Sequence, residues 1–355
     1  MFALAHAAKL ALRSYGTRTP FGRSRQARAS IVAHPKKRRS GAIKFADADF
    51  AATAGAARRS RSFTWPAMRA LMRLASCAVA AAMRPPPALV TFDCTGTLFD
   101  TRSSVGFQYK AAVVDVSRRK GGFKAASAAL DESALDAAFG GAYGKASTAR
   151  PNFGAGVCSS YDWWRAVVEE TFSGAGLPAD ACEALLPDAF EELFHQTFVT
   201  RKGWHLTPHA ARVLAELDAA RGDAGAMNVG VISNWDERLP LLLADLEVDQ
   251  HIDFVLTSRA AGVEKPDTTI FDLARERCGL PPDARMVHIG DSWGKDCVGA
   301  VAAGWEAVFV CPPERLAKLD AATRASMAAT PHVYLESLDG LAGALQQPEE
   351  ESALV

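Results

Sequence analysis

The segment ALVTFDCTGTL, residues 88–98, decides the fold. It opens with a short apolar run, residues 88–92, and turns polar at Asp93. Such a run is typical of a strand buried on both faces of a parallel sheet. Ligands of open parallel sheets bind beyond the carboxyl ends of the strands. Asp93 is therefore a candidate functional residue, and the Gly96-Thr97 turn after it disfavours a simple helix cap.

Further apolar runs of the same kind follow, separated by helical patterns. Strands are expected over residues 228–232, 253–256, 286–289 and 307–310. Helices are expected over residues 208–220, 269–278 and 296–304. Alternating strands and helices predict a doubly wound, Rossmann-like α/β fold with a parallel sheet.

Residues 105–202 differ, because their pattern is helical and contains no clear strand. Residues 181–198 show apolar side chains at steps of three and four with acids between them, as in an amphipathic helix. We therefore predict an α/β core formed by residues 88–104 and 203–345. A helical cap, residues 105–202, is inserted after the first strand.

The first 84 residues have the composition of a targeting segment. They hold 17 of the 40 Lys and Arg residues but only two of the 40 acids, and are rich in Ala and Ser. This pattern is typical of a mitochondrial or plastid transit peptide. A basic run at residues 36–39 leaves a nuclear location open, a second start at Met68 would resemble a weak signal peptide, and a cytoplasmic protein is the further alternative.

The rest of the chain excludes several classes of protein. It carries a net charge of −15, which disfavours nucleic-acid binding. No stretch of 18 apolar residues is present, so no transmembrane helix is expected. Seven cysteines without a Cys-x-x-Cys pair indicate reduced thiols.

Polar residues end three of the expected strands. Asp93 follows the first, Ser233-Asn234 follows the second, and Asp291 follows the run at 286–289, with Asp296 five residues later. Lys265 precedes Pro266 in an intervening loop. Carboxylates can hold Mg²⁺ and attack phosphorus, while hydroxyls and lysine bind phosphoryl oxygens. This set predicts Mg²⁺-dependent phosphoryl chemistry on a small phosphorylated metabolite.

The order of these motifs resembles the haloacid dehalogenase superfamily. The resemblance implies that Asp93 is the nucleophile and a Mg²⁺ ligand, with the Thr95 carbonyl, Asp291 and Asp296 completing the metal site. It further implies that Ser233 and Lys265 hold the phosphoryl group. The remaining candidate substrate contacts are Thr97, Asn234 and, in the cap, Arg150 and Asn152.

One position departs from the pattern of phosphatases in this superfamily. They usually carry a second aspartate two residues after the nucleophile, where this chain has Thr95. A threonine cannot serve as a general acid or base. General acid–base catalysis contributes about 10²–10⁴-fold in rate. We expect a phosphatase acting through an aspartyl-phosphate, with two alternatives: a 2-haloacid dehalogenase, which needs no metal, or a catalytically weak binding or regulatory protein.

Overall fold

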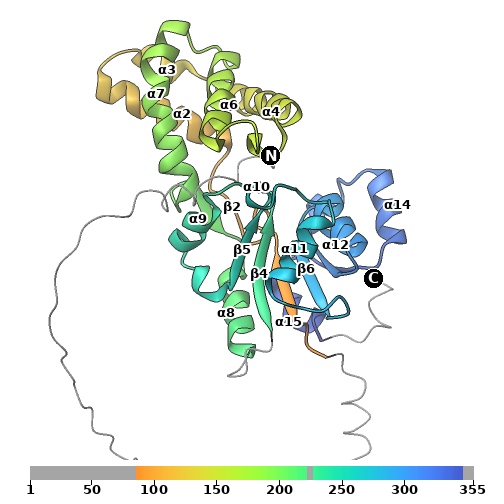
Figure 1. The fold of residues 1–355 in the computed structure, drawn as a ribbon. Coiled ribbons are helices and arrows are strands. Elements are labelled where there is room, and N and C mark those ends of the chain that lie inside the picture. The colour runs from red at the N-terminus through yellow and green to blue at the C-terminus, as the bar shows by residue number, and fades with distance from the viewer. Residues whose placement is uncertain (1–84, 222–226, 347–355) are drawn as a thin grey trace, which may run out of the picture. The chain divides into compact units, whose positions relative to one another are not determined.

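The computed structural model describes residues 85–221 and 227–346, so the predicted targeting segment lies outside the described residues. A parallel sheet of six strands forms the centre of the described part (Figure 1). Its strands, in spatial order, are β5 (Phe254–Thr257), β4 (Asn228–Ser233), β1 (Leu89–Phe92), β6 (Met286–Gly290), β7 (Glu306–Val310) and β8 (Val333–Leu335). The quoted segment thus supplies β1, which pairs with β4 and β6.

Both faces of the sheet are buried, as the continuous apolar runs require. Val90 and Phe92 belong to one core cluster, and Leu89 belongs to a second cluster on the other face. The first face packs on α8 (Ala210–Ala220), α9 (Leu239–Asp245) and α15 (Leu341–Ala344); the second packs on α11 (Thr269–Arg277) and α12 (Val298–Ala302). The predicted doubly wound α/β fold is therefore confirmed.

The five strands expected from apolar runs are all present, with bounds that agree within one residue. Three shorter strands were not predicted: β8, and the antiparallel pair β2 (Phe99–Thr101) and β3 (Trp204–Leu206). Each has only three residues, and β8 lies half-buried at the sheet edge. Runs this short carry too few residues to show a period.

Between β2 and β3 the chain is helical, as expected. The elements are α2 (Val105–Lys120), α3 (Lys124–Ala129), α4 (Glu132–Ala149), α5 (Pro151–Gly154), α6 (Ser160–Gly174) and α7 (Ala179–His195). The expected amphipathic helix ends three residues early, at His195, and a 3₁₀ turn (Thr197–Val199) follows. We call residues 105–202 the helical segment; its status as a separate domain stays a prediction, because the described residues all fall in one compact unit.

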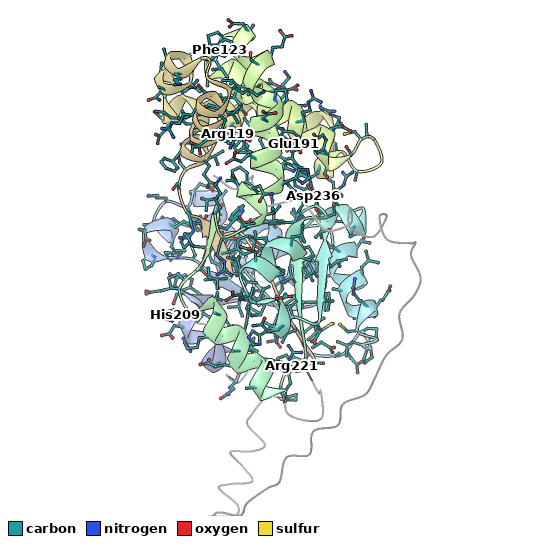
Figure 2. All side chains as sticks on the ribbon, turned by 90° about the vertical axis from the view of Figure 1, so that its left-hand side faces the viewer. Arg119, Phe123, Glu191, His209, Arg221 and Asp236 are labelled. Carbon is teal, nitrogen blue, oxygen red and sulfur yellow. The ribbon has the colours of Figure 1, made fainter. Side chains whose placement is uncertain are left out.

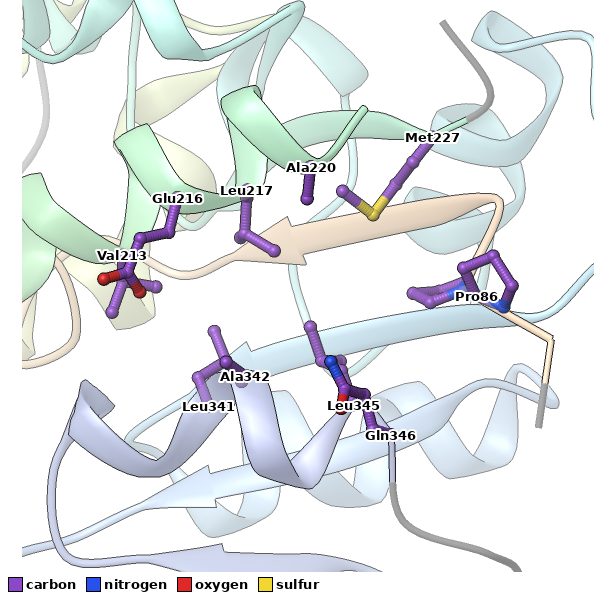
Figure 3. A pocket seen from close by; sticks show the side chains of 11 residues that line it. Pro86, Val213, Glu216, Leu217, Ala220, Met227, Leu341, Ala342, Leu345 and Gln346 are labelled. Atoms are coloured by element: carbon purple, nitrogen blue, oxygen red, sulfur yellow. The ribbon is translucent and has the colours of Figure 1, made fainter. Parts of the chain in front are cut away.

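The remaining helices are α10 (Ser258–Ala261), α13 (Pro313–Leu316) and α14 (Ala321–Ala329). None of the helices in the described ranges is both long and apolar enough to span a bilayer. An apolar hollow of about 290 Å³ lies between α8 and α15, beside Pro86 and Met227 (Figure 3). Pro86 lies three residues before β1 and Met227 directly before β4, so the hollow lies near the amino edge of the sheet.

Candidate active site

Three carboxylates meet at the carboxyl edge of the sheet. Asp93 follows β1, Asp291 follows β6, and Asp296 lies in a π-helical turn, Trp293–Cys297. Each offers an oxygen within 4.8 Å of the other two. The Asp93 side chain is 13% exposed, whereas those of Asp291 and Asp296 are 2% exposed. Asp93 is thus the carboxylate of this trio that a solute reaches most readily.

Two glycines allow the acidic loops to approach so closely. Gly96 has φ +81°, and a Cβ there would lie 2.3 Å from Asp291 Oδ2. A Cβ on Gly290 would lie within 2.4 Å of the Asp296 side chain. A larger residue at either position would separate the carboxylates.

The ammonium group of Lys265 offsets part of the negative charge of these carboxylates. Its ammonium group donates to Asp93 Oδ1 at 2.8 Å, to Asp296 Oδ1 at 2.6 Å and to the Ile232 carbonyl at 2.7 Å. These bonds use all three ammonium hydrogens. Burial works against the charged form, but the two carboxylates outweigh it and raise the pKa of Lys265. Lys265 therefore stays protonated.

The residues that follow β4 complete the surroundings of Asp93. Ser233 Oγ donates to Asp93 Oδ1 at 2.7 Å. Asn234 holds the Lys265 loop instead: its Nδ2 donates to the Lys265 carbonyl at 2.9 Å, and its Oδ1 accepts from the Lys265 amide at 2.7 Å. Ser233 thus contacts the candidate nucleophile, while Asn234 positions the lysine.

The two buried carboxylates have opposite environments. Burial, together with Asp93 and Asp296, raises the pKa of Asp291 to about 7, although Arg315 Nη1 lies 2.7 Å from its Oδ2. For Asp296 burial also opposes ionisation, but Lys265 and His288 outweigh it and hold its pKa below the usual range. Asp296 is therefore ionised at neutral pH, whereas Asp291 is poised to gain or lose a proton.

The other residues of the loop that follows β1 contact neighbouring parts of the core. Thr95 Oγ1 accepts a hydrogen bond from the Trp235 indole at 3.2 Å. Cys94 is fully buried in the core, and burial raises the pKa of its thiol. Thr97 is buried, and its carbonyl accepts from Thr207 Oγ1 at 2.5 Å. Thr97 does not line the cavity described next.

A cavity of about 270 Å³ opens over the carboxylates. Its walls include side chains from the core and from the helical segment; the lining residues are Asp93, Thr95, Tyr143, Phe153, Ser233, Asn234, Trp235, Glu264, Lys265, Asp291, Ser292, Lys295 and Asp296. The volume lies just below the usual range of about 300–1,000 Å³ for pockets that hold drug-sized ligands. Seven of the ten predicted site residues line this cavity.

The other three predicted residues lie elsewhere. Thr97 lies in the loop that follows β1, as noted above. Arg150 approaches Cys158 within the helical segment, and Asn152 Nδ2 donates to the Ser258 carbonyl of the core at 2.9 Å. Their neighbour Phe153 reaches the cavity. A further contact at this junction joins Trp164 Nε1 to the buried Asp236, 3.0 Å apart. Asp236 lies where the helical segment meets the core (Figure 2).

Several lining residues were missed by the sequence analysis. Trp235, Glu264 and Lys295 are direct neighbours of motif residues, so their positions offered a signal that could have been used. Tyr143 and Phe153 offered none, because the fold brings them from the helical segment.

Comparison with known proteins gives consistent matches. A family model described as haloacid dehalogenase-like hydrolase matches residues 87–304. Haloacid dehalogenase-like hydrolase domain-containing protein 3 of Bos taurus is 35% identical, covering 75% of this chain and 96% of the relative. The Mus musculus protein of that name is 33% identical with the same coverages. A solved 2-haloacid dehalogenase from Pseudomonas syringae pv. Tomato DC3000 is 22% identical, covers 73% of this chain and 98% of that chain, and has a TM-score of 0.48. The chain therefore belongs to the haloacid dehalogenase-like hydrolase family.

Proposed function

We propose that the protein is a Mg²⁺-dependent phosphatase that cleaves a small phosphate monoester through an aspartyl-phosphate on Asp93. The observation that carries this proposal is the convergence of Lys265 and Ser233 on one oxygen of Asp93. That arrangement leaves the second oxygen, Oδ2, to face the substrate. A relative named glyceraldehyde 3-phosphate phosphatase, 32% identical over 104 residues, gives additional support.

The carboxylate cluster fits a magnesium ion. Asp93, Asp291, Asp296 and the Thr95 carbonyl would hold it, because hard oxygen atoms are the ligands that Mg²⁺ prefers. The close approach that Gly96 and Gly290 allow is what such a site requires. When bound, the ion offsets repulsion between the carboxylates and the phosphate dianion.

The side chains then divide the reaction between them. Asp93 Oδ2 attacks phosphorus, and the bond from phosphorus to the ester oxygen breaks, so the leaving group takes the electron pair. Ser233 and the charge of Lys265 stabilise the phosphoryl oxygens as negative charge develops on them. Water then attacks the phosphorus of the aspartyl-phosphate, which releases inorganic phosphate and restores Asp93.

Thr95 determines which substrates suit this site. No carboxylic acid stands at this position, so the leaving oxygen departs unprotonated or takes its proton from water. Alkyl phosphates lose most from this, whereas aryl and acyl phosphates, whose leaving groups are weak bases, lose little. We expect a steep dependence of rate on leaving-group pKa and slow hydrolysis of the aspartyl-phosphate.

The test is hydrolysis of phenyl and acetyl phosphate with and without Mg²⁺, comparing wild type with Asp93→Asn. Asn keeps Oδ1 and its bonds to Ser233 and Lys265 but is not a nucleophile. Activity that needs both Mg²⁺ and Asp93, with a trappable phosphoenzyme, supports the proposal. Dechlorination of 2-chloropropionate without Mg²⁺ would favour the dehalogenase instead, although attack on carbon gives no role to the Asp291 and Asp296 pair.

We further propose that the helical segment acts as a cap that closes over the site, because it contributes Tyr143 and Phe153 to the cavity wall. The basic residues 1–84 are proposed to direct the protein to a mitochondrion or plastid. Import of a fluorescent fusion carrying only these residues would test that location.

A further inference from the structure

Two consecutive residues of the helical segment have an unfavourable backbone conformation. Asn152 has φ 50° and ψ 47°, and Phe153 has φ 55° and ψ 33°. Both lie in the left-handed region, which is unfavourable for a residue other than glycine and persists only where the surroundings enforce it. Such backbone conformations cluster at ligand sites, so this loop is a candidate for a functional role.

The surroundings that enforce this conformation belong to the core. Arg259, on α10, donates from Nη1 to the Phe153 carbonyl and from Nη2 to the Cys158 carbonyl, the latter at 2.7 Å. Its Nε also lies 3.0 Å from Glu237 Oε2. Asn152 adds its bond to the neighbouring carbonyl of Ser258. The position of Phe153 is therefore fixed relative to the core that carries Asp93.

The result is an aromatic wall beside the carboxylates. Phe153 lies 5.2 Å from the Trp163 ring in an edge-to-face contact, and Tyr143 lies 5.5 Å from the same ring. Phe153, Tyr143 and Trp235 all line the cavity above Asp93. Burial raises the pKa of Tyr143 to about 12, so its ring carries no charge at neutral pH. The wall thus offers aromatic surface to the part of the substrate that leaves.

We propose that Phe153 is a specificity-determining residue that selects phosphate esters with a flat aromatic leaving group. This inference rests on the proposed phosphatase function and names the substrate class of that site. Two independent features agree on it: the aromatic wall binds a ring, and Thr95 restricts turnover to leaving groups that depart without a proton. Aryl phosphates satisfy both conditions, whereas acyl phosphates satisfy only the second.

Kinetics of the Phe153→Leu variant on phenyl phosphate and acetyl phosphate test the proposal. An aromatic contact is worth about 0.5–1.5 kcal/mol, so KM for phenyl phosphate should rise about twofold to twelvefold more than KM for acetyl phosphate. The matched control is Phe107→Leu, since Phe107 is 48% exposed in the same helical segment. Equal changes for both substrates would mean that Phe153 only packs against its neighbours, and would overturn the proposal.

Binding of two phosphonates separates this inference from the proposed function, because it needs no turnover. Phenylphosphonate and methylphosphonate are titrated with Mg²⁺ present, and affinity is read by calorimetry. Phenylphosphonate should bind more tightly, and Phe153→Leu should remove most of that difference. Equal affinities in wild type would overturn the inference even if phosphatase activity is found. If the aromatic preference is present but no Asp93-dependent hydrolysis occurs, only the proposed function fails.

Discussion

Replacing Lys265 by Met should strongly destabilise the protein. The ammonium group bonds two buried carboxylates and one carbonyl, and its side chain is 1% exposed. Removing one partner of a buried ion pair costs about 3–5 kcal/mol, and leaving the Ile232 carbonyl without its donor costs about 1–3 kcal/mol more. A loss of about 4–8 kcal/mol is a large part of the 5–15 kcal/mol that folded proteins have.

The loss should depend on pH with a defined sign. Asp296 has a lowered pKa in the folded wild type, so it contributes stability above the unfolded pKa of about 3.9 that disappears as the pH falls. Without Lys265, Asp296 loses the main partner that lowers its pKa, so it binds a proton more readily in the folded state. The gap between wild type and variant should therefore narrow as the pH falls towards about 4.

Urea unfolding followed by tryptophan fluorescence measures both effects, with Lys265→Met compared with wild type at neutral and acidic pH. The matched control is Lys295→Met, which removes an exposed lysine from the same cavity and should change stability by about 0.5 kcal/mol or less. The double variant Lys265→Met/Asp296→Asn should regain part of the loss. A destabilisation below about 1 kcal/mol, or a gap that does not change with pH, would refute this account of Lys265.

Three further predictions concern other parts of the chain. Thr95→Asp should raise the hydrolysis of alkyl phosphates by up to about 10²–10⁴-fold and flatten the leaving-group dependence, measured on a series of esters; no gain on alkyl esters would show that another group supplies the acid. Mg²⁺ should raise the melting temperature, and Asp291→Ala should abolish this rise. Because the pKa of Asp291 is about 7 without metal, protons compete with Mg²⁺ and the rise should shrink as the pH falls through 7; a rise independent of pH would contradict this. Deleting residues 1–80 should leave a folded protein by circular dichroism, since that segment lacks an apolar period; a large loss of stability would contradict its assignment as a targeting segment.

The sequence predicted the core of the site better than its walls, for a physical reason. Asp93, Ser233 and Asp291 each stand directly after a buried strand, and parallel pairing brings such positions to one edge. Phe153 reaches the cavity because its own backbone is left-handed. Phenylalanine has no preference for that conformation, so the local sequence does not predict it. Arg315 lies on a helix 24 residues beyond Asp291, so its contact depends on tertiary packing.

Aromatic residues of the helical segment illustrate the same limit. Trp163 and Trp164 are both buried in the core. That Trp164 would bond Asp236, or that Trp163 would support Phe153 and Tyr143, depends on how α4 and α6 pack together. Periodicity predicts that a helix has an apolar face, whereas the partner of each side chain is set by the shapes of both surfaces.

The β2–β3 ribbon brings together the two ends of the helical segment. Thr101, where the chain leaves the core, is paired directly with Trp204, where it returns. A tight turn joining these two strands would bypass the whole helical segment without changing the order of any strand in the main sheet. Genetic insertion at a surface hairpin is a route by which domains are acquired and exchanged. The ribbon is thus the position at which the helices of another chain could be joined to this α/β core.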